Sequence, residues 1–370
     1  MEEVQIVIIG GGVVGCAVAA ELSAQYKDVF LLEQHPRLGM LTSSRNSGVI
    51  HSGIFSEPGS LKAAHCREGK RLTYQFCRQH DIPHRQTGKL ILAQTQGEED
   101  SLRQLYQRGL ANGLEGLQWL VPAEIRAREP HLQARSAIWV SDSGIVDSDR
   151  LVRGYAAVAQ QQGAQLIPNA RVNGIAAAQQ RLRLETTRGP LETQVLINSA
   201  GLFADEIAQM LGCPTARIYP CRGEYFEVRQ AKSHLLGTLA YPVPDATGHG
   251  LGVHLTKTLA GTILVGPNAR YISDKHDYEK DREPVEAFFE RARWMLPELE
   301  LEDLTMGYAG IRPKLLPPDQ QGSADFRIER DPLYPQAIHL LGIESPGLTA
   351  APSIARQVAR MVRETLEAVA

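Results

Sequence analysis

Three glycines near the N-terminus have the spacing of a nucleotide-binding turn. Gly10, Gly12 and Gly15 follow the apolar run 4–9 in the order G-x-G-x-x-G and precede a helix-forming stretch that runs to Leu22. In such a turn the first glycine permits a tight bend, the second lets the backbone approach a pyrophosphate, and the third lets the helix pack on the strand. The free N–H groups and positive dipole end of the helix would then face the phosphates.

A carboxylate stands at the end of the next apolar run, which covers residues 29–32. Glu33 lies 18 residues past Gly15, where it can accept hydrogen bonds from a ribose diol and would repel a 2′-phosphate. Strand, turn, helix, strand and terminal acid together predict a site for FAD or NAD rather than NADP.

The stretch GMLTSSRNSGVIHSGIF, from Gly39 to Phe55, has small and hydroxylated residues around one arginine and one histidine. It has no helical or strand period, and a loop of this length inside a compact domain is usually functional. It begins six residues after Glu33, where a dinucleotide that continues past its pyrophosphate would place its second half. We therefore expect this loop to contact the bound cofactor.

After this loop, the pattern of apolar and polar residues along the chain changes twice. Between 219 and 267, short alternating runs of apolar and polar residues predict antiparallel strands. A strand over 338–341, a glycine-rich turn and a helix from about Ala350 to Ala368 then return to the pattern of the nucleotide domain. Pro352 is expected in the first turn of that helix, where its missing N–H costs little.

These elements predict an α/β fold in which one domain interrupts another. A Rossmann-like FAD-binding domain, discontinuous in sequence, would carry an inserted α+β substrate domain built on a largely antiparallel sheet. The expected FAD-binding segments are 1–85, 145–215 and 306–370. The expected substrate-binding segments are 86–144 and 216–305.

Composition excludes several classes of protein. The 370 residues have a net charge of −3, so bulk charge gives no reason to expect a nucleic-acid partner. The five cysteines are scattered without metal-ligand spacing, which predicts reduced thiols and no metal site. The sequence has no window of about 18 uninterrupted apolar residues, so we expect no membrane span. We expect a cytoplasmic location, and peripheral contact with the inner face of the membrane stays an open alternative.

Eight short motifs occur along nearly the whole chain, in the order RNSGVIHSGIF, PGSLKA, GKLILA, SGIVD, PCRGEYF, YPVP, GVHLT and VGPNA. Together they resemble the D-amino acid oxidase-like superfamily of FAD-dependent oxidoreductases, which includes glycine oxidase, sarcosine oxidase and glycerol-3-phosphate dehydrogenase. Within it they most resemble the L-2-hydroxyglutarate dehydrogenases. NSGVIHSGI and RGEYF are the specific motifs, whereas the N-terminal glycine pattern is shared by many flavoproteins.

The resemblance implies bound FAD and places the loop beside it. Residues 42–47 would lie along the phosphates, the ribityl chain and the isoalloxazine, and His51 would lie near the ring face. Residues 347–349 would line the pyrimidine edge, where a helix N-terminus stabilises negative charge on the reduced ring. The implied cofactor-binding residues are Gly10, Gly12, Val14, Gly15, Glu33, Gln34, Thr42, Ser43, Ser44, Arg45, Asn46, Ser47, Val172, Ala200, Gly201, Gly347, Leu348 and Thr349.

The resemblance also implies oxidation of the C2–OH of a small 2-hydroxy acid, with L-2-hydroxyglutarate or a close analogue as the expected substrate. The hydroxyl proton must go to a base while the C2 hydride goes to flavin N5, and a neutral imidazole suits the base. Of the 11 histidines, His51 and His254 lie within the motifs, and either is a candidate.

A small anionic substrate needs cationic side chains to hold its carboxylates. Arg312 is the leading candidate, because a guanidinium can donate two parallel hydrogen bonds to a carboxylate. Arg222 and Lys314 are weaker cationic candidates. Tyr225 and Tyr241 could add hydroxyl donors.

Two other functions stay open. The segment GYAGIRPK, residues 307–314, resembles the amine-oxidising relatives, whose arginine binds a substrate carboxylate, so an amino-acid oxidase or dehydrogenase of the glycine-oxidase kind is an alternative. A flavin-binding partner protein without catalysis is an alternative from another class. The electron acceptor is open among a quinone, oxygen and an electron-transfer protein.

Overall fold

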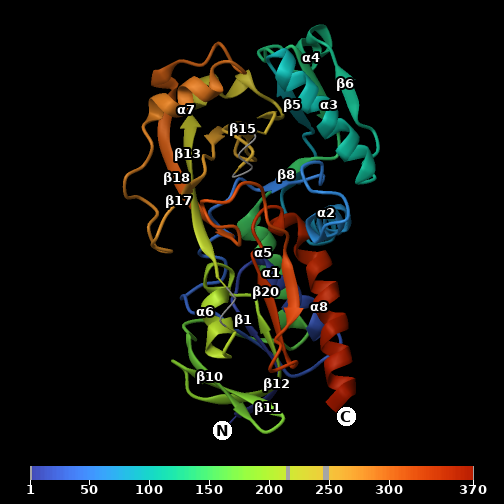
Figure 1. Ribbon diagram of the computed structural model, residues 1–370, viewed down its shortest axis with the longest axis vertical. Coiled ribbons are helices and arrows are strands. Elements are labelled where there is room, and N and C mark those ends of the chain that lie inside the picture. The colour runs from blue at the N-terminus through green and yellow to red at the C-terminus, as the bar shows by residue number, and fades with distance from the viewer. Residues whose placement is uncertain (1, 214–216, 245–249, 370) are drawn as a thin grey trace.

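The computed structural model describes residues 2–213, 217–244 and 250–369. Two sheets lie one above the other along the longest axis of the molecule (Figure 1). The sheet that contains β1 and β12 occupies the lower half, and the sheet that contains β13 and β5 occupies the upper half.

The lower sheet has a parallel centre. Strand β1 pairs in parallel with β2 and β12, β2 with β9, and β12 with β20, while β10, β11 and β19 add antiparallel pairs at the edges. The strand bounds are β1 (Glu2–Ile9), β2 (Val29–Leu32), β9 (Gln165–Ile167), β10 (Val172–Ala178), β11 (Arg181–Thr186), β12 (Leu191–Asn198), β19 (Arg327–Arg330) and β20 (Ala337–Leu341).

Burial on both faces of this sheet explains the continuous apolar run in β1. Ile6 and Ile8 pack in one core with helices α1, α5 and α8, whereas Val7 and Ile9 pack on the other face with β10, β11 and α6. Helix α8 follows one side of the molecule from its middle to the C-terminus and packs on α1 and α2 (Figure 1). The helix bounds are α1 (Val13–Ser23), α2 (Leu61–Gln79), α5 (Ser148–Gln161), α6 (Ala204–Met210) and α8 (Gly347–Val369).

The upper sheet is largely antiparallel, as the sequence predicts. Only the pair β14 and β5 is parallel among its described pairings, and β13 pairs with β18 along nearly its whole length. Helices α3 (Gln96–Ala111), α4 (Pro122–Arg128) and α7 (Val285–Ala292) accompany it. The strand bounds are β5 (Lys89–Ala93), β6 (Gln118–Leu120), β7 (Ser136–Val140), β13 (Tyr219–Val228), β14 (Leu239–Pro242), β15 (His254–Lys257), β16 (Ile263–Gly266), β17 (Arg270–Tyr271) and β18 (Leu304–Lys314).

A small third sheet of β3 (Val49–Ile50), β8 (Gly144–Val146) and β4 (His84–Arg85) lies between the two halves. Within the loop 39–55, two residues form β3 and pair with β8, and no strand or helix occupies the whole stretch. The loop ends before α2, whose N-cap Ser60 accepts a hydrogen bond from the Ala63 N–H. The loop is thus fixed between both sheets.

Two expected domain boundaries and the expected start of the last helix can be compared with the structure. Strand β18 belongs to the antiparallel sheet through Lys314, so the chain returns to the nucleotide sheet later than the expected boundary at 305/306. The expected boundary at 215/216 lies outside the described residues. Helix α8 begins at Gly347, so Pro352 lies in its second turn, where it cannot donate to the Leu348 carbonyl.

All five cysteines are buried and free, as the sequence predicts. Within the described residues, no helix is both long and apolar enough to cross a membrane, and no cluster of side chains has the composition of a metal site.

Candidate active site

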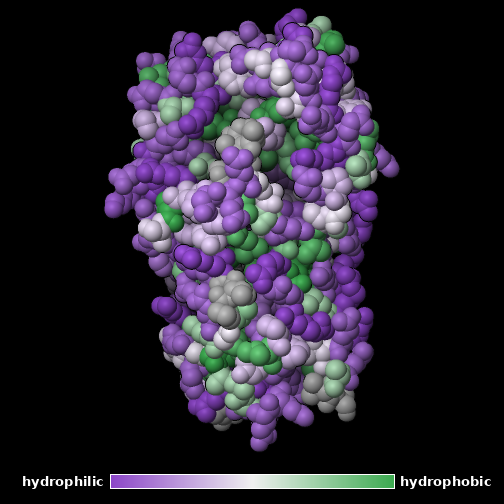
Figure 2. Space-filling model, viewed as in Figure 1, coloured by the Kyte–Doolittle hydropathy of each residue, from purple (hydrophilic) through white to green (hydrophobic). Residues whose placement is uncertain are grey.

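A cavity of about 630 Å³ lies between the two sheets. It begins at the glycine turn of the lower sheet, continues along the loop 39–55, and ends among the aromatic and cationic side chains of the upper sheet. In Figure 2, apolar side chains are recessed between hydrophilic rims in the upper half of the molecule. One cavity thus joins the expected nucleotide site to the expected substrate site.

The glycine turn has the close contacts that its spacing predicts. A Cβ on Gly10 would lie 2.5 Å from the Ser199 carbonyl oxygen, and a Cβ on Gly15 would lie 1.9 Å from the Gly10 carbonyl oxygen. Gly12 is the N-cap of α1 and has no side chain to cap the helix. The start of α1 is therefore open to a ligand that can accept hydrogen bonds.

Glu33 lies at the end of β2 and on the cavity wall. Its carboxylate accepts hydrogen bonds from the Gly11 N–H and the His35 N–H, both at 2.8 Å. These bonds hold the carboxylate in one orientation, and each oxygen has a further lone pair for a ribose hydroxyl.

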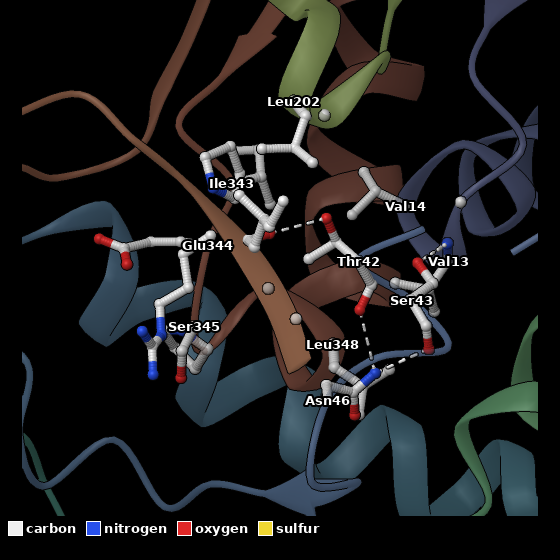
Figure 3. Close-up of a pocket in the computed structure, with 18 of the residues that line it drawn as sticks. Val13, Val14, Thr42, Ser43, Asn46, Leu202, Ile343, Glu344, Ser345 and Leu348 are labelled. Atoms are coloured by element: carbon white, nitrogen blue, oxygen red, sulfur yellow. Dashed lines mark hydrogen bonds between the residues drawn. The ribbon is translucent and has the colours of Figure 1, made fainter. Parts of the chain in front are cut away.

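The loop presents hydroxyl and amide groups to the cavity. Ser43 Oγ accepts from the Val13 N–H at 2.9 Å, and Asn46 Nδ2 donates to the Ser43 carbonyl at 2.7 Å (Figure 3). Thr42 Oγ1 donates to the Ile311 carbonyl at 3.1 Å, which ties the loop to β18. These contacts place the loop across the cavity from the segment that contains Ser345 (Figure 3).

His51 lies at the end of the loop strand β3, with different groups at its two ring nitrogens. Nδ1 lies 3.5 Å from Lys89 Nζ, and Nε2 lies 3.3 Å from Ser345 Oγ. The backbone N–H of His51 donates to Thr349 Oγ1, which ties the residue to the start of α8. Burial holds the pKa of His51 well below its usual value, and the nearby Lys89 and His254 act in the same direction, so the ring is neutral.

His254, the first residue of β15, is also buried and lines the cavity. Its Nδ1 lies 2.8 Å from the Gly252 carbonyl, so Nδ1 carries the proton and Nε2 keeps its lone pair. Burial is the main reason why the pKa of His254 falls to about 3, and the charges of Lys89 and Arg312 act in the same direction. The ring stacks on Tyr241 with 3.7 Å between centroids.

Arg312 reaches the cavity from β18. Both of its Nη atoms donate to the Asn268 carbonyl, at 3.1 and 3.2 Å, which fixes the guanidinium plane. A Cβ on Gly223 would lie only 2.8 Å from Arg312 Nη2, so the glycine of the RGEYF motif makes room for this side chain.

Tyr225, Tyr241 and Lys314 line the same cavity. Burial raises the pKa of both tyrosines, so their hydroxyls stay protonated and can donate hydrogen bonds. Lys314 lies 3.7 Å from Glu344, which also pairs with Lys62 at 3.0 Å. Although burial alone would raise it, these two ammonium groups hold the pKa of Glu344 below its usual value.

Arg222 does not lie with these residues. Its side chain is fully buried away from the cavity, where Nη2 lies 2.8 Å from Glu224 and Nη1 lies 3.2 Å from Asp277. A guanidinium held by two carboxylates has no free edge for a substrate. The expectation that Arg222 binds substrate is therefore replaced by a structural role.

Most of the other expected cofactor residues line the cavity, and three do not. Gly15 acts through helix packing. Ser44 is exposed and donates to the Leu41 carbonyl. Thr349 is buried and bonded to His51 and Val49. Those on the wall are Gly10, Gly12, Val14, Glu33, Gln34, Thr42, Ser43, Arg45, Asn46, Ser47, Val172, Ala200, Gly201, Gly347 and Leu348.

Sequence reasoning missed Lys62, Lys89, Ser345 and Glu344. For Lys89 a signal was present, because it stands at the head of the apolar run LILA, and a lysine in a fully buried strand is unusual. For the other three, only the fold shows that they face the cavity.

Comparison with known proteins identifies the family. The family model described as FAD dependent oxidoreductase (DAO) matches residues 5–361. The chain belongs to the DAO family. Curated relatives include the L-2-hydroxyglutarate dehydrogenase of Indibacter alkaliphilus, which is 32% identical over 95% of this chain and 96% of the relative. The mitochondrial L-2-hydroxyglutarate dehydrogenase of Homo sapiens is 31% identical over 98% of this chain and 89% of the relative.

Solved structures agree on the fold of the DAO family. The L-alpha-glycerophosphate oxidase from Mycoplasma pneumoniae with FAD bound has a TM-score of 0.90 and 32% identity, and covers 98% of this chain and 95% of its own. Glycine oxidase from Geobacillus kaustophilus has a TM-score of 0.83 and 22% identity, and the match covers 98% of this chain and 95% of the glycine oxidase. At this identity the likeness shows the fold alone. The chain is thus an FAD-dependent oxidoreductase with an α/β DAO fold.

FAD is the cofactor of the family, and the residues described here fit it. The start of α1, where Gly12 leaves room beside the Ser43 hydroxyl, suits the pyrophosphate. The oriented carboxylate of Glu33 suits the ribose, and the start of α8 suits the pyrimidine edge. When bound, FAD supplies an acceptor for two electrons.

Replacement of Gly12 by valine is expected to abolish FAD binding. A Cβ at this position already lies 3.1 Å from Ser43 Oγ, so a branched side chain would fill the space over the helix start. The ratio of FAD absorbance to protein after purification measures the effect. Gly174→Val is the matched control, because a Cβ there has no neighbour within 4 Å. Full FAD content in Gly12→Val would contradict this placement of the pyrophosphate.

Replacement of Gly223 by alanine is expected to displace Arg312 and leave FAD bound. The added Cβ would lie 2.8 Å from both Arg312 Nη2 and Pro267 Cβ, so the guanidinium must move. A displacement of this size lowers kcat/KM by roughly 10- to 10²-fold if Arg312 orients the substrate. Steady-state kinetics of this variant and of Gly97→Ala, which has open space around its Cβ, make the comparison. Equal kcat/KM in the two variants would count against a role for Arg312.

Proposed function

We propose that this DAO-family enzyme oxidises the C2–OH of a small 2-hydroxy acid, L-2-hydroxyglutarate or a close analogue, to the 2-oxo acid. The observation that carries the proposal is that two neutral imidazoles and the Arg312 guanidinium share one cavity. Removal of a hydroxyl proton needs a neutral base, and an anionic substrate needs a cationic anchor. The names of the curated relatives support the same donor class.

Arg312 is the anchor for the C1 carboxylate. Its Nη atoms are fixed by the Asn268 carbonyl and it lines the cavity near Tyr225, whose protonated hydroxyl can donate a second hydrogen bond. Lys62 and Lys314 also line the cavity. Both pair with Glu344, and their ammonium groups are candidates to hold the second carboxylate of a diacid.

His51 is the base that takes the hydroxyl proton. It is tied through its backbone to Thr349 at the start of α8 and through Nε2 to Ser345, so it lies on the side of the cavity that suits the reactive ring of the cofactor. His254 stacks on Tyr241 and keeps a lone pair on Nε2, so it is the alternative acceptor for the same proton. A single hydroxyl donates only one hydrogen bond, so only one of the two rings takes the proton.

Anaerobic addition of candidate donors, followed by the loss of flavin absorbance, tests the donor class. The panel contains L-2-hydroxyglutarate, L-lactate, L-malate, glycine, L-glutamate and glycerol 3-phosphate, the last because the glycerophosphate oxidase structure is 32% identical to this chain. We expect rapid bleaching by 2-hydroxy acids and fastest bleaching by L-2-hydroxyglutarate. Bleaching by amino acids alone, by glycerol 3-phosphate alone, or by no donor would overturn the proposal.

The dehydrogenase names of the relatives imply an electron acceptor that reoxidises the cofactor. Stopped-flow reoxidation with oxygen, with a soluble quinone and with an electron-transfer protein ranks the three acceptor classes by rate.

A further inference from the structure

Lys89 is a buried amine with an unusual environment. It is the first residue of β5 and is 0% exposed. Its Nζ lies 3.5 Å from His51 Nδ1, 4.2 Å from the centroid of the Tyr241 ring and 5.3 Å from that of the Phe55 ring. The amine is therefore enclosed by two aromatic rings and one imidazole nitrogen.

No carboxylate among the described residues lies within ion-pair distance of Lys89. Asp142, whose charge acts on the amine, is itself paired with Lys70. Burial lowers the pKa of Lys89 to about 7, although the neighbouring Cys66 and Asp142 act in the opposite direction. An amine in this state can accept a proton near neutral pH, which an ordinary lysine cannot do.

The position of the His51 ring, between the cavity and Lys89, allows it to pass a proton to the Lys89 amine. One ring nitrogen faces the cavity side at Ser345, and the other faces the Lys89 amine. A proton that arrives at Nε2 can leave from Nδ1, because the ring loses one proton as it gains the other. The low basicity of the buried His51 ring means that the proton does not stay on it.

We infer that Lys89 is a positioning residue that receives, through the His51 ring, the proton removed from the substrate hydroxyl. The substrate O–H bond breaks and an N–H bond forms at His51 Nε2, while the Nδ1–H bond breaks and an N–H bond forms at Lys89 Nζ. The electron pair of the C2–H bond leaves as hydride to the cofactor of the family, and the substrate becomes a ketone. The inference rests on the proposed function, because it requires a hydroxyl donor.

Other charged or titratable groups around the pair do not replace the amine in this role. The Cys66 thiol donates to the His51 carbonyl, and burial raises its pKa to about 12, so it stays protonated. The remaining groups that act on the pair are Asp142 before β8, which is paired with Lys70, Tyr241 on β14 and His254 on β15. Lys89 is the one whose proton affinity lies near neutrality and whose Nζ contacts the ring of His51.

The proton exchange between His51 and Lys89 can be observed without substrate, through the tautomer of the His51 ring. Below pH 7 the Lys89 ammonium donates to Nδ1, so the neutral His51 ring carries its proton on Nε2. Above pH 7 the amine accepts from Nδ1–H, so the proton moves to Nδ1. We expect this change of tautomer, with a midpoint at about 7, in ¹⁵N NMR of the FAD-loaded protein with labelled histidine, in which His51 is assigned from His51→Asn.

A single His51 tautomer from pH 6 to 8.5 in the unmodified protein would overturn the inference. This measurement does not depend on the folding of any Lys89 variant, and it does not depend on the identity of the substrate. If no 2-hydroxy acid reduces the flavin, the proposed function fails while the tautomer measurement still decides whether Lys89 and His51 exchange a proton.

Variants of Lys89 test the role in turnover. Anaerobic flavin reduction by L-2-hydroxyglutarate should become faster in the unmodified protein as pH rises through 7. In Lys89→Met this rise should vanish and the rate at pH 8 should fall roughly 10²-fold, the lower end of what acid–base catalysis contributes. Lys89→Arg should be at least as slow, because a guanidinium keeps the charge and cannot give up its proton.

Two controls separate the role from general damage. Lys257→Met removes another lysine of lowered pKa in the same sheet, whose amine bonds the Ser233 carbonyl, and should leave rate and pH profile unchanged. FAD content and thermal unfolding show whether each variant is folded. An unmodified rate or an unmodified pH profile in Lys89→Arg would show that only the positive charge matters and would refute the inference.

Discussion

Replacement of His51 by asparagine is expected to slow flavin reduction by about 10²–10⁴-fold, the range that a general base contributes. Asparagine keeps a polar side chain in the buried site but cannot take the hydroxyl proton. FAD should stay bound, because the glycine turn and Glu33 lie at the other end of the cavity. Anaerobic single-turnover reduction by L-2-hydroxyglutarate measures the loss without interference from the electron acceptor.

His254→Asn is the matched comparison, because it removes the second neutral imidazole from the same cavity. We expect a smaller loss, since in the proposed reaction His254 is not the group that takes the hydroxyl proton. A larger loss in His254→Asn than in His51→Asn would exchange the two roles. Near-normal rates in both variants would refute a histidine base altogether.

Arg312→Lys is expected to lower kcat/KM by at least about 10²-fold with changes in both kcat and KM. Lysine keeps the charge but loses the planar pair of donors, and a hydrogen bond to a charged group contributes about 1.5–3 kcal/mol. The reaction also needs the C2–H bond aligned within about 3–3.5 Å of its acceptor, which a fixed anchor ensures. Steady-state kinetics compare this variant with Arg330→Lys, an arginine outside the cavity lining.

A modified substrate shows whether Arg312 meets the C1 carboxylate. The C1 ester of the hydroxy acid should react slowly with the unmodified enzyme and should lose little more in Arg312→Ala, because each change removes the same contact. Independent, additive losses would place the carboxylate elsewhere. Arg45 and Lys314, which also line the cavity, would then be the candidates.

The nucleotide end of the site was predictable because its signal is local. Gly10, Gly12 and Gly15 belong to one strand–turn–helix unit, and the closest contact of a Cβ on Gly15 would be with the Gly10 carbonyl oxygen inside it. Glu33 follows directly on a buried strand that must lie beside the first. Each inference needed only the order of neighbouring elements, which the periodicity of the sequence gives.

The choice between Arg222 and Arg312 was not predictable in the same way. Strand β13 pairs with β18 so that Cys221 lies opposite Arg312 and Arg222 lies opposite Ile311. Successive side chains of a strand point to opposite faces, so the two arginines are directed to opposite sides of the sheet. A shift of one residue in the register would have placed both arginines on the same face, so the choice between them depends on the strand pairing.

The pairing of His51 with Lys89 was unpredictable for a related reason. His51 directly follows β3 and Lys89 begins β5, which lie in different sheets, and their side chains meet only because the sheets are packed together. The sequence showed an unusual lysine before an apolar strand, but its partner depends on tertiary structure.

The proposed reaction converts an L-2-hydroxy acid to the 2-oxo acid by removal of the C2 hydride and the hydroxyl proton. Its most direct test is anaerobic titration of the FAD-loaded protein with L-2-hydroxyglutarate and identification of the product by mass spectrometry. We expect one equivalent of 2-oxoglutarate for each FAD reduced, with the L enantiomer and not with the D enantiomer. Full flavin reduction without 2-oxoglutarate, or an unreduced flavin at saturating L-2-hydroxyglutarate, would contradict the account.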